Sequence, residues 1–255
     1  MSKFYFASDF HLGIDARVSS REREKQIVRW LDSIQDDALE IFLVGDVFDF
    51  WFEYRSVVPK GHSRLLGKLA QIRDKGIPIQ FFTGNHDMWM FSYFEEELGI
   101  AIHRQPVMRV LAGKKFFIGH GDGLGPNDGG YKFIKRVFSS PVSQWLFARL
   151  HPNLTFSLAR FWSSKSRETA AAKNEFLGKD NEWLVQYANH KLHELDVDYF
   201  VFGHRHLPIN CLLDNGISRY FNLGDWLHYN SFGVFDGSEM HLDFFENKEG
   251  YAVEL

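Results

Sequence analysis

Five short clusters of Asp, His and Asn stand out as residues that could do chemistry. They read SDFH, VGDVFD, TGNHD, IGHGD and FGHRH, at residues 8–11, 44–49, 83–87, 118–122 and 202–206. Carboxylate, imidazole and amide oxygen together suit divalent ions such as Mn²⁺, Fe²⁺ and Zn²⁺. A single Asp-x-His is a weak signal, because a lone histidine at a strand end usually has a structural role. Five such clusters predict a metal centre, since so many idle buried polar groups would be costly.

Each cluster follows an apolar run that predicts a buried strand, at residues 3–8, 39–44, 77–82, 114–118 and 197–202. Helical periodicity over 20–35, with Ser19 or Ser20 as N-cap, and over 61–75 separates the first three strands. Strands that alternate with helices are typical of a parallel sheet. Ligands of such sheets collect at the carboxyl ends of the strands. The five clusters are therefore expected to converge in space.

The second half of the chain has a different pattern. Residues 131–195 are predicted to be mostly helical, with interruptions at Pro141 and Pro152. Antiparallel strands are expected around 207–213, 218–223, 229–235 and 239–245, separated by Asp-Asn-Gly and Asp-Gly turns. The 255 residues are expected to form a single α/β domain, 1–255, with a helical insertion at about 131–175.

The insertion is basic and aromatic, although the whole chain has a net charge of −4. Residues 131–173 contain eight Lys or Arg and one acidic residue, Glu168. This distribution predicts an anionic partner, and the alternative is a solvated helix face. No extended basic groove is visible in the sequence, so we expect no nucleic-acid partner.

The cysteine content and the absence of long apolar runs indicate the cellular compartment of the protein. The single cysteine, Cys211, excludes a disulfide within the chain and a Cys-based zinc site. The first residues, MSKFYFASDF, do not resemble a signal peptide, and no apolar run is long enough to span a bilayer. We therefore expect a cytoplasmic protein.

The ordered set D-x-H, G-D-x-x-D, G-N-H-D, G-H and G-H-x-H resembles the calcineurin-like metallophosphoesterases, over the whole predicted α/β body. The resemblance implies an α/β fold of two mixed β-sheets in a sandwich flanked by helices. It also implies an enzyme with two divalent metal ions, Mn²⁺ first and Fe²⁺ or Zn²⁺ as alternatives. One ion would be bound by Asp9, His11 and His206, the other by Asn85, His120 and His204, and Asp46 would bridge them.

The same resemblance implies roles around these ligands. A hydroxide that bridges the two metals would attack phosphorus. Asp49 would orient a metal ligand. His86 would stabilise or protonate the leaving group, and Asp87 would orient His86.

Three further stretches narrow the resemblance to one branch of the family, the UDP-2,3-diacylglucosamine pyrophosphatases of lipid A biosynthesis. They are Phe50 and Trp51 after the second cluster, the segment HGDGLGPNDGGYKFIKRVF with Asp122 and Asp128, and NLGDW at 222–226. The branch implies a lipid-linked nucleotide substrate, hydrolysed at its pyrophosphate to UMP and 2,3-diacylglucosamine 1-phosphate. Substrate contacts would come from Asn85, Asp128, Ser166, Lys173 and His204.

The insertion fits such a substrate. Its basic residues would meet phosphates or the cytoplasmic face of the inner membrane, as peripheral contact. Its apolar residues would meet the acyl chains: Phe133, Phe138, Trp145, Leu146, Phe147, Leu150, Phe156, Leu158, Phe161 and Trp162. The alternative is that these side chains pack the insertion onto the body.

His86 departs from this branch, which carries Arg at that position. An imidazole would also serve a poorer alkoxide leaving group. A second hypothesis therefore stays open, a metallophosphoesterase of the same fold that acts on another phosphodiester or nucleotide-linked lipid. A non-enzymatic scaffold is disfavoured, since every expected ligand type is present.

Overall fold

The strands of the protein form two six-stranded sheets in a computed structural model that describes residues 2–125, 129–159 and 175–255. The first sheet has the strand order β11-β10-β1-β2-β3-β4. β1 to β4 run parallel, and β10 and β11 add an antiparallel hairpin beside β1. The bounds are β1 Lys3–Ala7, β2 Ala38–Val44, β3 Ile79–Phe82, β4 Ala101–His103, β10 Ser231–Phe235 and β11 Met240–Phe244.

The second sheet has the order β12-β8-β9-β7-β6-β5. β6, β7 and β9 run parallel, whereas β5 and β8 are antiparallel to their neighbours β6 and β9. The bounds are β5 Val107–Leu111, β6 Lys114–Ile118, β7 Tyr199–Phe202, β8 Pro208–Leu212, β9 Arg219–Leu223 and β12 Val253–Glu254.

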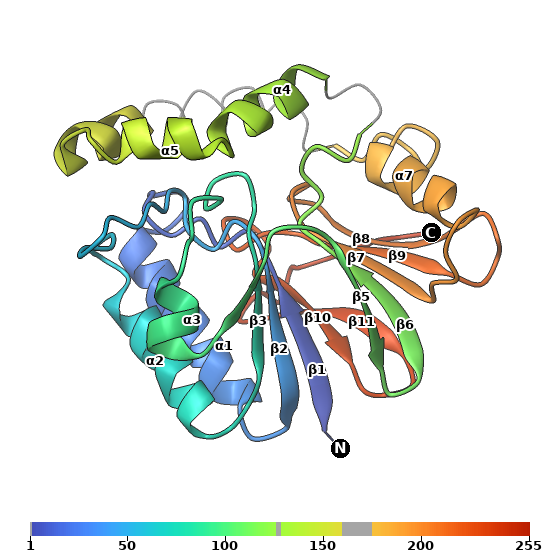
Figure 1. The fold of residues 1–255 in the computed structure, drawn as a ribbon. Coiled ribbons are helices and arrows are strands. Elements are labelled where there is room, and N and C mark those ends of the chain that lie inside the picture. Colours follow the sequence, from blue (N-terminus) through green and yellow to red (C-terminus); the bar gives the residue numbers. More distant parts are fainter. Residues whose placement is uncertain (1, 126–128, 160–174) are drawn as a thin grey trace.

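The two sheets pack face to face, and helices cover their outer faces (Figure 1). One buried cluster joins residues of both sheets, among them Phe6, Phe42, Phe116 and Phe221. α1 (Ser20–Ile34), α2 (Ser63–Asp74) and α3 (Tyr93–Leu98) pack on the first sheet, and α7 (Trp183–Lys191) packs on the second. The inner strands are covered on both faces, which explains why they read as continuous apolar runs.

The sequence-based expectations for the body are confirmed. The two sheets with flanking helices are the predicted fold class, and Ser19 caps α1 by accepting a hydrogen bond from the Glu22 N–H at 3.2 Å. The predicted antiparallel pairs are β8–β9 and β10–β11, although they belong to different sheets. Pro141 and Pro152 begin helical segments, as proline does in a first helical turn.

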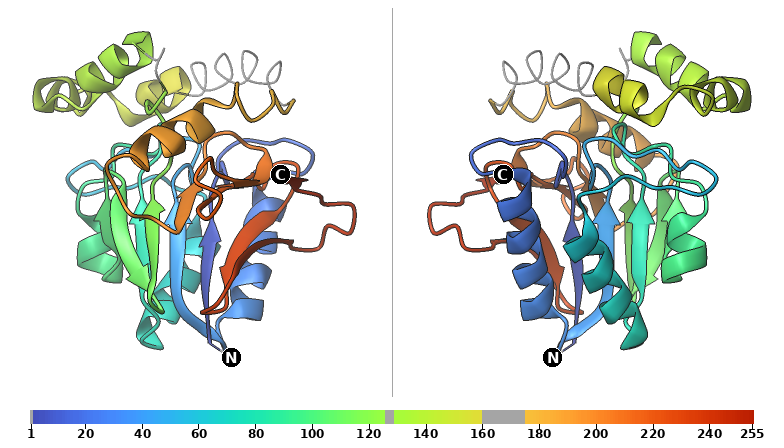
Figure 2. Two further views of the ribbon diagram at one scale, coloured as in Figure 1. Left: turned by 90° about the vertical axis from the view of Figure 1, so that its right-hand side faces the viewer. Right: turned by 90° about the vertical axis from the view of Figure 1, so that its left-hand side faces the viewer.

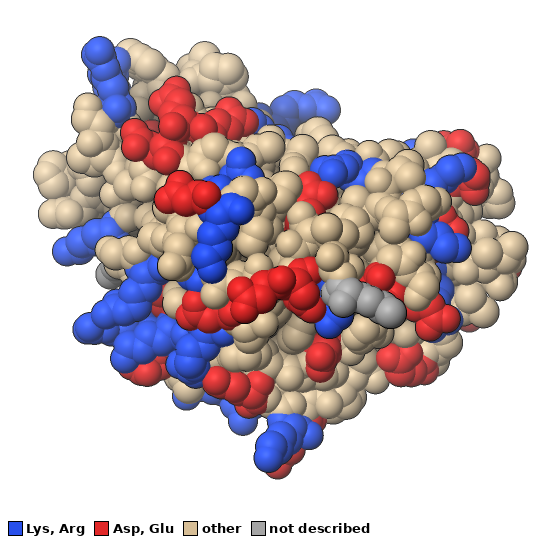
Figure 3. All heavy atoms as spheres, turned by 90° about the horizontal axis from the view of Figure 1, so that it is seen from below, with Lys and Arg blue, Asp and Glu red and all other residues tan. Residues whose placement is uncertain are grey.

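The described part of the insertion is helical and lies over one edge of the body (Figures 1 and 2). It comprises α4 (Gly129–Phe138), α5 (Pro141–Phe147) and a helical segment at 152–159. Its rings pack on the loops after β2 and β3, through the pairs Phe147–Phe50, Phe147–Phe52, Phe147–Trp89, Phe138–Trp89 and Phe156–Phe50. The Tyr54 and Thr155 hydroxyls lie 2.6 Å apart. On the face opposite the insertion, acidic and basic side chains are interspersed (Figure 3).

Candidate metal centre

The five clusters lie in loops at one edge of the sandwich, the edge that faces the insertion (Figure 1). Each follows the carboxyl end of a parallel strand: β1, β2, β3, β6 or β7. The structure brings their side chains into three overlapping groups of possible ligands. These are Asp9 with His11 and His206, Asp46 with His120 and His204, and His11 with Asp46 and His86.

The first group places two imidazole nitrogens against one carboxylate oxygen. The Nε2 atoms of His11 and His206 lie 3.2 Å apart. Asp9 Oδ1 lies 3.1 Å from His206 Nε2 and 3.7 Å from His11 Nε2. An ion with bonds of about 2.1 Å holds neighbouring ligands about 3.0–3.4 Å apart, so these spacings suit one.

The second group is arranged around His120. Its Nδ1–H donates to the Val44 carbonyl at 2.9 Å, which leaves Nε2 as the ligand atom. That Nε2 lies 3.2 Å from Asp46 Oδ2. Oδ1 of Asn85 is buried and accepts no hydrogen bond from any residue that the structure describes. An unsatisfied buried oxygen of this kind is accounted for by a cation.

Asp46 stands between the two groups. Its Oδ2 lies 3.8 Å from His11 Nε2, in the first group, and 3.2 Å from His120 Nε2, in the second. Its Oδ1 accepts the backbone N–H of His86 at 2.8 Å, which fixes the carboxylate. This is the placement that a bridging ligand requires.

The backbone carries strain at the same positions. Five candidate ligands have left-handed φ angles between 45° and 66°, namely Asp9, His11, Asp46, His204 and His206. Non-glycine residues rarely adopt this region, and they concentrate at functional sites. The glycines of the clusters make room for the ligands. A Cβ at Gly84 would collide with the Asp46 carboxylate, and one at Gly203 with Asp9.

The electrostatics show that the site favours positive charge. Burial opposes a charged His120, but the Asp46 carboxylate raises its pKa to about 10. For His11, burial is outweighed by hydrogen bonding to Asp49 and Asp9, which raises the pKa to about 8. Burial lowers the pKa of His204 to about 4. Divalent ions would displace the extra protons of His120 and His11, whereas His204 is already neutral and can bind an ion without losing one.

His86 is held by Asp49 and not by Asp87. His86 Nδ1 lies 3.0 Å from the Asp49 carbonyl oxygen, and the neutral ring donates there. The Asp87 carboxylate instead accepts backbone N–H bonds from Val47 at 2.8 Å and Gly84 at 2.7 Å. The predicted role of Asp87 is therefore wrong. Asp87 ties together the loops after β2 and β3, because its buried oxygens need N–H donors.

The Asp49 carboxylate lies beside His11 and His86. Its Oδ1 is 3.5 Å from His11 Nδ1 and 3.6 Å from His86 Nδ1. One buried carboxylate thus faces the non-ligating nitrogen of a candidate ligand and the ring of His86.

Sequence reasoning gave Asp225 no role. This buried carboxylate follows β9, and its Oδ2 lies 3.2 Å from His206 Nδ1 and 2.9 Å from His228 Nδ1. Its Oδ1 accepts the His228 backbone N–H at 2.8 Å. The sequence does contain a signal for Asp225. It lies in the motif NLGDW just after β9, as the five clusters lie just after their strands.

A buried ion pair beside the centre was also missed. Arg205, between the candidate ligands His204 and His206, donates from Nε and Nη2 to the two Glu182 oxygens, both at 3.0 Å. Glu182 also accepts the Leu177 N–H at 3.2 Å. The pair therefore joins the segment that returns from the insertion to the metal loop.

The predicted substrate contacts are only partly described. Asp128, Ser166 and Lys173 lie outside the described residues, as do the side chains of Phe133, Phe161 and Trp162. Phe138, Phe147 and Phe156 contact rings of the body, as expected on the alternative that they pack the insertion onto the body. Trp145, Leu146, Leu150 and Leu158 remain 40–56% exposed.

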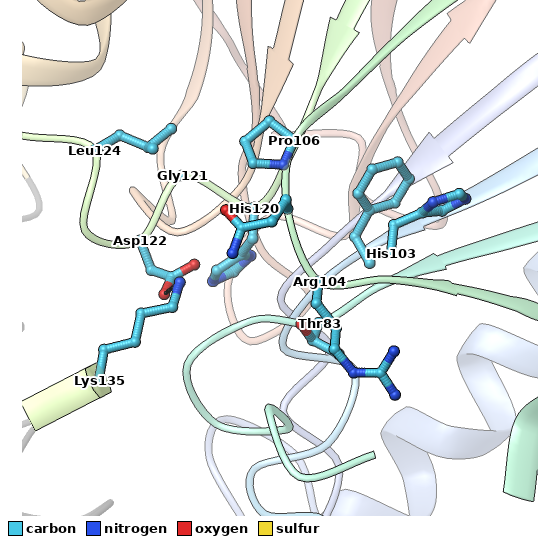
Figure 4. A pocket seen from close by; sticks show the side chains of 11 residues that line it. Thr83, His103, Arg104, Pro106, His120, Gly121, Asp122, Leu124 and Lys135 are labelled. Carbon is cyan, nitrogen blue, oxygen red and sulfur yellow. Dashed lines mark hydrogen bonds and ion pairs between the residues drawn. The ribbon is translucent and has the colours of Figure 1, made fainter. Parts of the chain in front are cut away.

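A cavity with both polar and apolar walls adjoins the centre at His120 (Figure 4). Lys135 of α4 reaches Asp122 on one side of it, and Thr83 and Arg104 lie on the other. The Lys135 Nζ to Asp122 Oδ2 distance is 2.6 Å. The cavity therefore lies between the insertion and the loop that carries His120.

Comparison with known proteins identifies a family and several similar proteins. The family model of the calcineurin-like phosphoesterases matches residues 2–208. A protein of Porphyromonas gingivalis named UDP-2,3-diacylglucosamine hydrolase is 39% identical over 97% of this chain and 99% of its own. One of the same name from Aeromonas salmonicida is 26% identical over 93% and 91%. A phosphoesterase structure from E. coli covers 96% of this chain and 93% of its own at 17% identity, with a TM-score of 0.47.

Proposed function

The chain belongs to the calcineurin-like phosphoesterase family, and we propose that it hydrolyses UDP-2,3-diacylglucosamine to UMP and 2,3-diacylglucosamine 1-phosphate. The observation that carries the substrate is the 39% identity, over 97% of the chain, to a relative named UDP-2,3-diacylglucosamine hydrolase. The groups Asp9/His11/His206 and Asp46/His120/His204, with Asp46 between them, fit a metal-dependent phosphoesterase.

In this proposal Asp9, His11 and His206 hold one divalent ion, Asn85, His120 and His204 hold a second, and Asp46 bridges them. When bound, two such ions supply an activated water as nucleophile and offset the charge of the phosphate oxygens. Mn²⁺ is the first choice, and Fe²⁺ or Zn²⁺ fit the same nitrogen and oxygen ligands. Asn85 and His204 are also proposed to contact the reacting phosphate.

His86 serves the leaving group. Its Nδ1–H is engaged by the Asp49 carbonyl, so Nε2 is the atom that faces the reaction. Burial lowers the pKa of His86, and the carboxylates of Asp46 and Asp49 work against that shift. Only the imidazolium form carries a proton on Nε2 as well as on Nδ1, so the protonated form of His86 would donate a proton or stabilise charge as the phosphate departs.

The insertion, about 131–175, is proposed to act as a lid for the lipid half of the substrate. Trp145, Leu146, Leu150 and Leu158 offer apolar surface on it, and Arg149 stacks over the Trp145 ring with its Cζ 4.8 Å from the centroid. Asp128, Ser166 and Lys173 remain proposed substrate contacts. The chain is then a single domain whose insertion supplies substrate specificity.

For a lipid-linked substrate, we propose that the protein binds peripherally to the cytoplasmic face of the inner membrane. Among the described residues, no helix has the length and apolarity needed to span a bilayer. Apolar and basic side chains on one helical segment bind anionic surfaces by burial and by charge. Trp145→Asp should therefore lower the fraction of protein that sediments with phosphatidylglycerol vesicles. Equal binding of variant and wild type would remove the insertion face from membrane contact.

His86 favours a second candidate, hydrolysis of a phosphodiester with a poorer leaving group. An alkoxide needs a proton donor more than a phosphate does. The two candidates are separated by offering purified protein with Mn²⁺ both UDP-2,3-diacylglucosamine and a glycerophosphodiester such as glycerophosphoethanolamine, whose leaving group is an alkoxide. We expect faster release of UMP from the lipid nucleotide. Cleavage of the diester with the lipid nucleotide intact would overturn the proposed substrate but not the enzyme class.

A further inference from the structure

The cavity beside His120 has the chemistry of a phosphate subsite. Its walls come from four segments: the loop after β3, the β4–β5 connection, the loop after β6, and α4 of the insertion. His120 is shared with the candidate metal centre, so a group bound there is adjacent to the reacting phosphate. Figure 4 shows Lys135 extending from α4 to Asp122 of the His120 loop, on one side of the cavity.

Lys135 is placed by a buried carboxylate. Asp122 Oδ2 lies 2.6 Å from the Lys135 Nζ, and the Asp122 side chain is 5% exposed whereas that of Lys135 is 30% exposed. An ammonium has three N–H donors, and this ion pair occupies one of them. The charged end of Lys135 is thus held at the cavity with donors still available to an anion.

A pyrophosphate needs such a cation in addition to the metals. Metal ions held by the candidate ligands would offset the charge of the phosphate under attack. The substrate carries a second phosphate group beside it. A charge-assisted hydrogen bond from Lys to phosphate is among the stronger polar contacts available. An acyl chain, in contrast, would desolvate both Lys135 and Asp122 at a cost.

We propose that the cavity between Thr83, His120 and Lys135 binds the second phosphate of the substrate, and that Lys135 is the cation that recognises it. This inference rests on the proposed function for its substrate class, a pyrophosphate-linked nucleotide. Asp122 is the positioning residue of Lys135. The subsite makes the enzyme selective for pyrophosphates over simple diesters.

The test is calorimetric binding of UDP and UMP to the Mn²⁺-loaded protein, because the two ligands differ by one phosphate. Wild type should bind UDP more tightly than UMP. Lys135→Gln should weaken UDP binding about tenfold and UMP binding much less, since one charged hydrogen bond is lost. Lys135→Arg should restore most of the difference. Lys191→Ala is the matched control, a helical lysine paired with Glu194 at 2.7 Å.

Two results would overturn the subsite. Equal weakening of UDP and UMP by Lys135→Gln would mean that Lys135 acts through the His120 loop. Unchanged binding of both ligands would mean that the cavity does not hold the second phosphate. Failure of the proposed function is a separate result, the absence of UMP release from UDP-2,3-diacylglucosamine by the wild type.

Discussion

At the scale of single residues, three neighbours after β3 have three different environments. Asn85 has a buried oxygen without a hydrogen-bond partner among the described residues, His86 contacts the Asp49 carbonyl, and Asp87 ties two loops through backbone N–H groups. Residue types at strand ends were enough to predict a ligand cluster. The partner of Asp87 could not be predicted, because it depends on how the loop curves within a few residues.

Replacing His86 by alanine tests its role as an acid or charge stabiliser. His86→Ala should lower the turnover number by about 10² or more, the usual contribution of a positioned proton donor. Both metals should remain bound, as counted by elemental analysis of the purified variant. His86 also lies within a group with His11 and Asp46. Loss of one metal would therefore make it a ligand and contradict the assigned role.

Asp225 should control the tautomer of His206. Asn in its place can keep accepting the His228 backbone N–H, but its amide N–H₂ then faces His206 Nδ1. His206 must accept there, so Nε2 carries the proton and cannot bind metal. Asp225→Asn should weaken one of the two metal sites about 10- to 100-fold in calorimetric titration of the metal-free protein with Mn²⁺. His228→Gln is the control. Equal weakening of both sites would point to general disruption instead.

At the scale of elements, strands with a continuous apolar run and amphipathic helices were predictable, whereas β4, β5 and α3 were not. β1, β2, β3, β6 and β7 are buried on both faces, so their sequences signal them plainly. β4 has three residues, α3 has six, and β5 lies at the edge of its sheet, where only its last residue is buried. Such elements form only because their neighbours are already in place.

The Arg205–Glu182 pair is expected to stabilise the link between the insertion and the metal loop. Glu182→Gln leaves a buried guanidinium without its carboxylate, and should lower the free energy of unfolding by about 3 kcal/mol in urea titration. Asp196→Asn, which removes the exposed partner of Lys115, serves as the control and should change little. A Glu182 variant as stable as this control would show that water replaces the pair.

At the scale of the whole molecule, the fold has two parts with different roles. A rigid sandwich positions the candidate ligands at one edge, and a basic, aromatic insertion lies over that edge (Figure 1). The sequence was sufficient to predict this division, because periodicity and charge both change near residue 131. It could not reveal which insertion rings anchor to the body and which face outward, since both kinds are Phe, Trp or Leu.

The most direct measurement is activity against bound metal. Protein stripped with chelator should release no UMP from UDP-2,3-diacylglucosamine, and activity should rise with added Mn²⁺ until two equivalents are bound. The ion pairs around Asp46 predict this stoichiometry, because one carboxylate serves both groups of ligands. Full activity in the stripped protein, or a plateau at one equivalent, would contradict a dinuclear hydrolase.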